Sequence, residues 1–223
     1  MVEKRMFEYK GTNITWLGHD SFKIEDLGQT LVIDPFQLGH EARADYILIS
    51  HEHFDHCNSE DLKKVLKPST VVVAISSCED ELSKVKPKEV KVVKPGDKVK
   101  VGDFEVSAVP AYNVNKFSAP GKAFHPKAEG KVGYLIKTKS GTTIYHTGDS
   151  DLIPEMENLK PDIALVPVSG TYVMTAEEAV QAVAKIKPKI AIPMHFGGIV
   201  GTLADAEKFK QNASCEVQIL QKE

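Results

Sequence analysis

The chain has 223 residues, 42% of them hydrophobic, which is enough to bury a complete core, and no linker or low-complexity segment divides it. We therefore expect a single domain over residues 1–223. The net charge of −3 and the pI near 6.3 provide no basic footprint for nucleic acid, so a small molecule is the expected partner.

Short apolar runs alternate with turn signals along the chain, as expected of strands. The first half predicts three consecutive antiparallel strands, then a strand, a helix and another strand, at 13–17, 21–24, 30–34, 46–50, 59–66 and 70–74. Two hairpins and two buried strands follow, at 99–109, 132–145, 163–168 and 190–192. Residues 110–130, rich in proline, glycine, asparagine and lysine, are typical of a flexible loop that serves as a functional lid.

Two further helices are predicted near the end of the chain. Thr175 and Glu178 form a capping box that opens the first, and Pro188 closes it. Thr202 with Asp205 can start the second. Strands in two sets, each followed by helices, imply two sheets packed face to face with helices outside, an α+β fold.

The sequence also argues against a membrane or secreted protein. No apolar stretch approaches the roughly 20 residues of a membrane span, and residues 1–5 lead into no signal-peptide core. Cys57, Cys78 and Cys215 have neither metal-ligand nor redox spacing, which fits a reducing compartment. These features predict a cytoplasmic protein.

The densest chemical feature is the segment that follows the strand at 46–50. It contains His51, His53, Asp55 and His56, and imidazole and carboxylate are the ligands that zinc, iron and manganese take in hydrolytic sites. If the segment stays extended, alternation puts His51, His53 and Asp55 on one side, while His56 can join Asp55 on a second metal. A chance cluster or a metal-scavenging surface patch is the alternative.

Three other residues have comparable chemistry. Asp149 and His195 each lie just after a predicted strand, where side chains project from a sheet edge. Taken alone, Asp149 could instead cap a turn, and His195 could be an ordinary partly buried histidine. His125 lies in the long loop at 110–130.

Together these motifs resemble the metallo-β-lactamase superfamily over essentially the whole chain. The resemblance rests on a His-x-His-x-Asp-His run after a strand, a Gly-Asp after a later strand and a strand-terminal histidine. It implies a four-layer αββα sandwich with a two-metal site between its sheets. The segments 16–22, 33–35, 145–149 and 193–195 resemble the small metal-dependent hydrolases that include ascorbate-phosphate lactonase and are related to N-acyl-ethanolamine phospholipase D.

The resemblance also implies a role for each candidate ligand. His51 and His53 match ligands of the first metal, Asp55, His56 and His195 match those of the second, and Asp149 matches the bridging carboxylate. The superfamily usually supplies one more first-metal histidine after the strand corresponding to 104–109, where this chain has none. We expect His125 to take that place, with Asn113 or a water as alternatives.

Other residues are expected to assist. Asp55 would orient the attacking water and move a proton to the leaving group, and His19 would help at the pocket unless turn backbone satisfies it. The resemblance also implies that Asp34 accepts a hydrogen bond from a ligand imidazole. His146 is expected either to support a ligand or to face substrate.

The sequence thus predicts a metal-dependent hydrolase with two divalent ions, zinc or manganese first and iron or nickel according to supply, acting on a small ester, lactone or phosphodiester. Three alternatives stay open: a di-iron redox protein on the same fold, an RNA-processing nuclease, which the acidic balance disfavours, and a non-catalytic metal-binding module. Exposed strand edges could also pair copies into a homo-oligomer.

Overall fold

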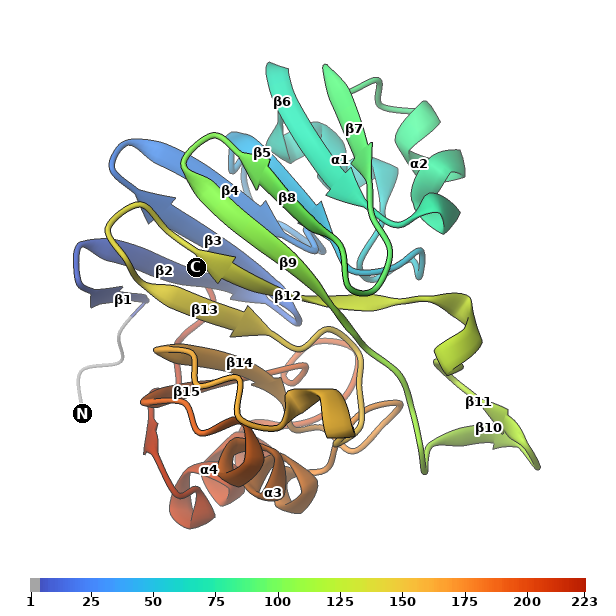
Figure 1. Cartoon of the computed structure of the whole chain (residues 1–223), viewed down its shortest axis with the longest axis vertical. Coiled ribbons are helices and arrows are strands. Elements are labelled where there is room, and N and C mark those ends of the chain that lie inside the picture. Colours follow the sequence, from blue (N-terminus) through green and yellow to red (C-terminus); the bar gives the residue numbers. More distant parts are fainter. Residues whose placement is uncertain (1–4) are drawn as a thin grey trace.

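The computed structural model describes residues 5–223, and residues 1–4, which belong to the segment tested for a signal peptide, lie outside the described residues. Two seven-stranded mixed sheets form the body of the molecule (Figure 1). The first sheet has the order β1-β2-β3-β4-β5-β6-β7. Its strands are Met6–Tyr9, Thr12–Gly18, Ser21–Asp26, Gln29–Ile33, Ala44–Ile49, Leu66–Ala74 and Glu89–Val92.

The second sheet has the order β16-β15-β14-β13-β12-β9-β8. In chain order its strands are Lys98–Val101 (β8), Phe104–Pro110 (β9), Val132–Lys137 (β12), Thr143–His146 (β13), Ile163–Pro167 (β14), Ile190–Met194 (β15) and Glu216–Val217 (β16). Neighbours β8, β9, β12 and β13 pair antiparallel, whereas β13 to β16 pair parallel.

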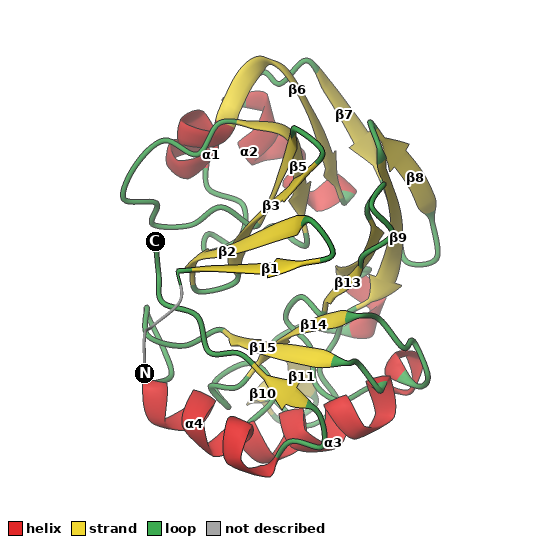
Figure 2. Ribbon diagram, turned by 90° about the vertical axis from the view of Figure 1, so that its left-hand side faces the viewer, coloured by secondary structure: helices red, strands yellow, loops and turns green. Residues whose placement is uncertain are grey.

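Helices cover the outer faces of both sheets. Near the β5 to β7 edge lie α1 (Ser59–Val65) and α2 (Glu79–Ser83), and under the second sheet lie α3 (Ala176–Ile186) and α4 (Leu203–Asn212) (Figure 2). Thr175 and Glu178 cap α3 reciprocally, as predicted, and its inner stripe packs Ala182 and Val183 on the sheet. The predicted α+β fold, a four-layer αββα sandwich, is confirmed.

Most of the strands that the structure adds to the predicted set are short or at a sheet edge. β1, β7 and β16 are edge strands, and β7 reads Glu-Val-Lys-Val with every residue at least partly exposed. Such segments lack the apolar face on which the predictions depended. The helix predicted to reach Leu66 ends at Val65, because Leu66 already begins β6.

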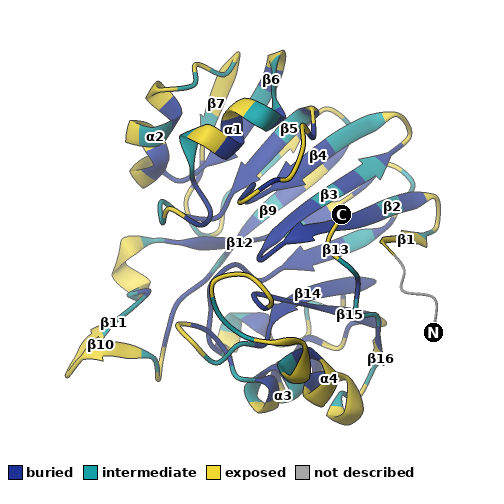
Figure 3. Cartoon of the chain, turned by 180° about the vertical axis from the view of Figure 1, so that it is seen from behind, coloured by how far each residue is buried: buried dark blue, intermediate teal, exposed yellow. Residues whose placement is uncertain are grey.

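The loop at 110–130 has more structure than expected. It holds a two-stranded hairpin, β10 (Phe117–Ala119) and β11 (Lys122–Ala123), which projects from the body and is mostly exposed (Figure 3). The short 3-10 helix Lys127–Glu129 then leads into β12. This segment returns the chain to the space between the two sheets.

The two sheets meet closely at the end of β5. Tyr134 on β12 donates its hydroxyl to the backbone oxygen of Ile49 at 2.6 Å, and the amide of Val132 donates to the oxygen of Ser50 at 3.2 Å. Gly133 permits the close packing of β12 on the end of β13, because a Cβ there would lie 2.5 Å from the Thr147 oxygen. The motif that starts at His51 therefore faces the strand ends of the second sheet.

Candidate metal centre

The motif after β5 folds into a tight turn. The amides of His56 and Cys57 both donate to the oxygen of His53, at 2.9 and 2.8 Å. The expectation of an extended segment with His51, His53 and Asp55 on one side is wrong, because the backbone turns back on itself at His53. The turn instead divides the motif into two donor groups.

The first donor group is defined by His51, His53 and His125, with Asp149 beside it. His53 Nδ1 lies 3.1 Å from His51 Nε2 and 3.3 Å from His125 Nε2, and His125 Nε2 lies 3.2 Å from Asp149 Oδ2. Tetrahedral ligands at 2.0 to 2.1 Å from zinc are separated by about 3.3 Å. The structure thus brings His125 to the place where the sequence lacked a ligand.

Asn113 holds His125 in this position. Its Oδ1 accepts hydrogen bonds from His125 Nδ1 at 2.9 Å and from the His125 amide at 2.8 Å, and its Nδ2 donates to the oxygen of Tyr172. His125 Nε2 is therefore the nitrogen left for the first donor group. Asn113, considered above as an alternative ligand, contacts the back of the histidine.

The second donor group is defined by Asp55, His56 and His195, which form one cluster with His19, and Asp149 lies beside it. His56 Nε2 lies 3.4 Å from Asp149 Oδ1 and 3.8 Å from Asp55 Oδ2, and His195 Nε2 lies 3.6 Å from Asp149 Oδ2. Asp149 therefore touches both groups. This is the position expected of a bridging carboxylate.

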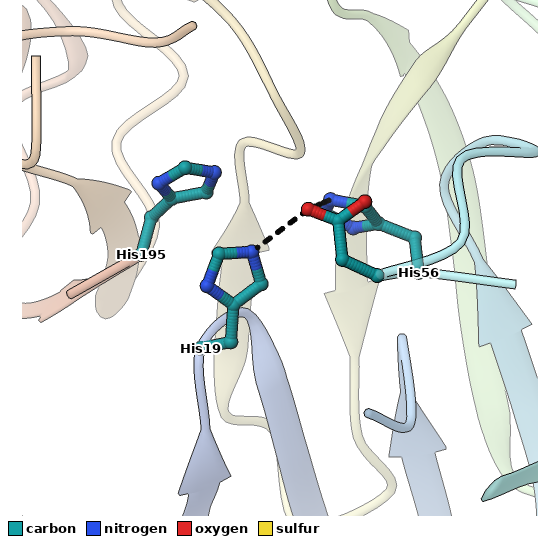
Figure 4. Close-up of side chains that lie close together, drawn as sticks. His19, His56 and His195 are labelled. Atoms are coloured by element: carbon teal, nitrogen blue, oxygen red, sulfur yellow. Dashed lines mark hydrogen bonds and ion pairs between the residues drawn. The ribbon is translucent and has the colours of Figure 1, made fainter. Parts of the chain in front are cut away.

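His19 adjoins the second donor group. Its Nε2 lies 3.2 Å from Asp55 Oδ2, and its ring centroid lies 4.2 Å from that of His195. Figure 4 shows the imidazoles of His19, His56 and His195 directed toward a common space from three separate segments. Both His19 and His195 have positive φ, 52° and 59°, a strained conformation that concentrates at functional sites.

Most of these imidazoles are held by a hydrogen bond at the nitrogen that faces away from the donor groups. Asp34 Oδ2 lies 2.9 Å from His56 Nδ1, which is the contact expected of it. Ser50 Oγ bonds His51 Nδ1 at 2.9 Å, and Ser169 Oγ bonds His195 Nδ1 at 2.8 Å. Such partners fix ring orientation and raise ligand basicity. Ser50, Ser169 and the positioning role of Asn113 were not predicted from the sequence, since isolated serines and asparagines have no distinctive signature.

The protonation states suit cation binding at most of the candidate ligands. His56 is the exception: burial lowers its pKa, but Asp149 and Asp34 outweigh burial and raise that pKa well above its ordinary value, so a metal ion would displace a proton there. Burial lowers the pKa of His51 well below its ordinary value and also lowers the pKa of His53. Burial raises the pKa of Asp55, but the hydrogen bond from His19 together with the charge of His56 outweighs it and brings that pKa to about 2. Burial likewise opposes ionisation of Asp149, yet His56 and His195 hold its pKa well below the usual range. Ionised carboxylates and neutral imidazoles are the forms that bind metals.

Unpaired atoms give an independent test of fit. His56 Nε2, His195 Nε2 and Asp149 Oδ1 are buried and have no hydrogen-bond partner. Buried polar atoms are ordinarily satisfied, so three such atoms around one space indicate a missing partner. A divalent cation accepts nitrogen and carboxylate ligands together, and the donor set therefore fits one.

His146 neither supports a ligand nor faces substrate. It is fully buried, its Nε2 donates to the oxygen of Asp20, and its Nδ1 accepts from the amide of Gly148, so it supports the strand end. Asp20 was not singled out from the sequence, yet it lies with His56, Asp149 and His195 in a third potential ligand cluster.

A cleft of about 360 Å³ opens onto the first donor group. Asp149, Asp55, His53 and His125 lie on its floor. Its walls come from four loops and are formed by Phe54, Phe124, Tyr172, Ile199 and Val200. The centre is therefore accessible to a small molecule.

An αββα sandwich with paired His/Asp donor groups between its sheets defines a protein of the metallo-β-lactamase superfamily. A family model described as a beta-lactamase superfamily domain matches residues 13–195. A UPF0173 protein of Pyrococcus furiosus is 36% identical over 89% of both chains, and a UPF0173 metal-dependent hydrolase of Caldivirga maquilingensis is 32% identical over 88% of this chain and 87% of its own. The chain belongs to the UPF0173 metal-dependent hydrolase family of this superfamily.

Solved structures agree with the fold. A protein of Parabacteroides distasonis matches with a TM-score of 0.79 and 30% identity over 97% of this chain and 98% of its own. A metallo hydrolase from Ignicoccus hospitalis matches with a TM-score of 0.75 and 22% identity over 95% of both chains. Among residues 5–223, no helix has the length and apolar character needed to cross a membrane.

Proposed function

We propose that the protein is a hydrolase that holds two divalent ions, one in each donor group, and cleaves a small ester, lactone or phosphodiester. One observation carries the proposal: two His/Asp donor groups share Asp149 at the floor of an open cleft. The relatives named metal-dependent hydrolases support the same conclusion. Two ions at such a site lower the pKa of water toward neutrality and stabilise developing negative charge.

The chain's own residues would supply the remaining steps. Asp55 lines the cleft and can orient a water toward the substrate, because its Oδ1 is not the atom that contacts His19. After attack, Asp55 can pass the proton to the leaving group. His19 holds the other oxygen of Asp55 at 3.2 Å and so fixes the direction of the carboxylate.

Finer features belong to the same proposal. Zinc and manganese are the ions we favour, and the branch that includes ascorbate-phosphate lactonase and N-acyl-ethanolamine phospholipase D is the resemblance we favour. We propose a cytoplasmic setting, which the three free cysteines support. The pairing of copies through sheet edges stays a prediction.

Metal analysis combined with an activity screen tests the proposal. Protein loaded with zinc, manganese or iron should bind two ions per chain and hydrolyse at least one member of a panel of esters, lactones and phosphodiesters. His51→Ala should abolish that activity, whereas Lys100→Ala, on the distant strand β8, should retain it. Metal-free wild type, or full activity in His51→Ala, would reject the proposal.

The same measurements separate the alternatives. Bound iron that changes oxidation state between aerobic and anaerobic preparations, without hydrolysis of any substrate, would favour a di-iron redox protein. Two bound ions with no turnover of any substrate would favour a non-catalytic module. RNA cleavage that depends on His51 would identify a nuclease.

A further inference from the structure

The walls of the cleft are apolar although much of their surface is exposed. Phe54, Tyr172 and Ile199 are 63%, 40% and 42% exposed, and the ring centroids of Phe124 and Tyr172 lie 4.7 Å apart. Four separate loops converge to build this surface. Contiguous exposed apolar area of this kind is typical of a ligand-binding site.

The cleft has no basic wall. Its described lining contains neither lysine nor arginine, and Asp55 and Asp149 add negative charge to its floor. The nearby lysines are engaged elsewhere: Lys131 pairs with Glu52 and Glu129, and Lys116 with Glu178 and Asp151. Sites for phosphate groups commonly use arginine or lysine to bind the anionic oxygens. In this cleft only the metal ions would neutralise the negative charge of a phosphodiester.

We propose that the cleft takes an uncharged carboxylic ester or lactone that carries an apolar group. The inference rests on the proposed function and selects one class from it. Water adds to the carbonyl carbon, the bond between that carbon and the ester oxygen breaks, and the products are a carboxylate, an alcohol and one proton. The apolar group lies against Phe54, Phe124 and Tyr172, where its burial contributes binding energy.

Matched chromogenic substrates test this selectivity. On metal-loaded full-length protein, kcat/KM for p-nitrophenyl hexanoate should exceed that for p-nitrophenyl acetate by at least about tenfold, because each methylene in an apolar pocket adds discrimination. Bis(p-nitrophenyl) phosphate should be the poorest of the three. Equal rates for the two esters, or preference for the phosphodiester, would overturn the inference.

A charge-insertion variant locates the effect in the cleft. Ile199→Lys should lower kcat/KM for the hexanoate ester at least about tenfold and raise it for the phosphodiester. Val92→Lys, at a residue 62% exposed on the remote strand β7, is the matched control and should change neither. An unchanged substrate order in Ile199→Lys would contradict the assignment of the wall.

Binding measurements keep this inference separate from the proposed function. If no substrate is hydrolysed by metal-loaded protein, the proposed function fails. Calorimetry with hexanamide and acetamide then still tests whether the cleft binds an apolar group. Tighter binding of hexanamide by wild type, lost in Ile199→Lys, supports the inference, and equal binding of the two amides rejects it.

Asp20 carries a second inference from a different observation. The residue is fully buried between β2 and β3, and neither carboxylate oxygen has a hydrogen-bond partner. One of its oxygens lies within 4.8 Å of ligand atoms of His56, Asp149 and His195. A buried carboxyl group beside another carboxylate requires either a shared proton or a positive partner.

We infer that Asp20 is a further ligand of the ion in the second donor group. That ion would then have carboxylate ligands from Asp20 and Asp149 beside the imidazoles of His56 and His195, whereas the first donor group offers three imidazoles and one carboxylate. Carboxylate-rich sites suit harder ions such as manganese, and imidazole suits zinc. The chain would therefore favour different metals in its two donor groups.

Metal stoichiometry tests this role without relying on activity. Asp20→Asn should bind one manganese ion per chain instead of two. Asp26→Asn, at a buried carboxylate that has its own partners in Thr12 and Ser140, is the control and should retain two. Two manganese ions bound with wild-type affinity in Asp20→Asn would overturn the inference.

A variant that fails to fold does not end the test. In a crystal structure of manganese-loaded wild type, an Asp20 oxygen bonded to the metal supports the ligand role. An Asp20 that contacts Asp149 alone rejects it.

Discussion

The two donor groups share one carboxylate but differ in almost every other respect. The first is imidazole-rich and reaches the cleft, with the His53 side chain 41% exposed. The second has a larger share of carboxylates and is more deeply buried: His56 and His195 are fully buried, and Asp55 is its member that lines the cleft. Close packing holds a buried ligand in place, whereas a half-exposed ligand can move. The first group is therefore accessible from the cleft, and the second is held more firmly.

Removing the shared residue should have the largest effect, because it damages both groups. Asp149→Asn is expected to lower kcat/KM for the preferred ester by at least about a thousandfold, as for residues that act as a unit. Metal content should fall in the same variant. Retention of two ions with normal turnover would show that Asp149 does not join the groups.

Removing one ligand from each donor group should reduce the stability of the protein by different amounts. In metal-free protein, His56→Ala removes the buried imidazole that contacts both Asp34 and Asp149 and should reduce the free energy of unfolding by about 3 kcal/mol. His53→Ala removes a half-exposed ring and should cost under about 1 kcal/mol. Urea unfolding in the presence of a chelator measures the free energy of unfolding of both variants. Equal losses would show that the two donor groups do not differ in how firmly they are held.

Positioning residues should act on one group each. Asn113→Ala frees His125, and Ser169→Ala frees His195, so each variant should weaken one ion by about 10- to 100-fold while the other keeps its affinity. Competitive titration with a chromophoric chelator resolves the two affinities. A loss of both ions in either variant would mean that the groups are coupled more tightly than their geometry indicates.

The smallest effect concerns a charge far from the centre. Burial raises the pKa of Asp162, but hydrogen bonds from Lys189 and Thr143 outweigh it and hold that pKa well below its ordinary value of 3.8. A lowered pKa stabilises the fold above the unfolded value, and this contribution disappears as pH falls through the folded value. Asp162→Asn should therefore cost about 1 kcal/mol at pH 7 and less below pH 4, with metal content unchanged. Urea unfolding at both pH values checks this, and a pH-independent difference would contradict it.

Some parts of the metal centre and its supporting strands could be predicted from the sequence, and others could not, for physical reasons. His51, His53, Asp55 and His56 lie within one short segment of the sequence, so their chemistry is visible as a motif even though their turn geometry is not. Periodicity located the buried strands that carry them, because these strands have strong apolar patterns. The edge strand β7 and the hairpin β10–β11 lack such patterns and escaped prediction.

Residues that act through a single oxygen were also hard to predict. Ser50 and Ser169 matter because the fold places their hydroxyls beside an imidazole, and nothing in the local sequence encodes that contact. Asp20 stood beside His19 in the sequence, but its burial without a partner became visible only when the second sheet covered it. Long-range packing, and not residue type, distinguishes such residues.

The position of the centre between the two sheets has a kinetic consequence. Each donor group needs residues from both halves of the chain, so neither group exists until the sheets have docked, and such long-range contacts form late in folding. Bound ions would then stabilise the native state more than the folding transition state. Metal should slow unfolding strongly and leave the refolding rate nearly unchanged, so that the ions stabilise the native state kinetically.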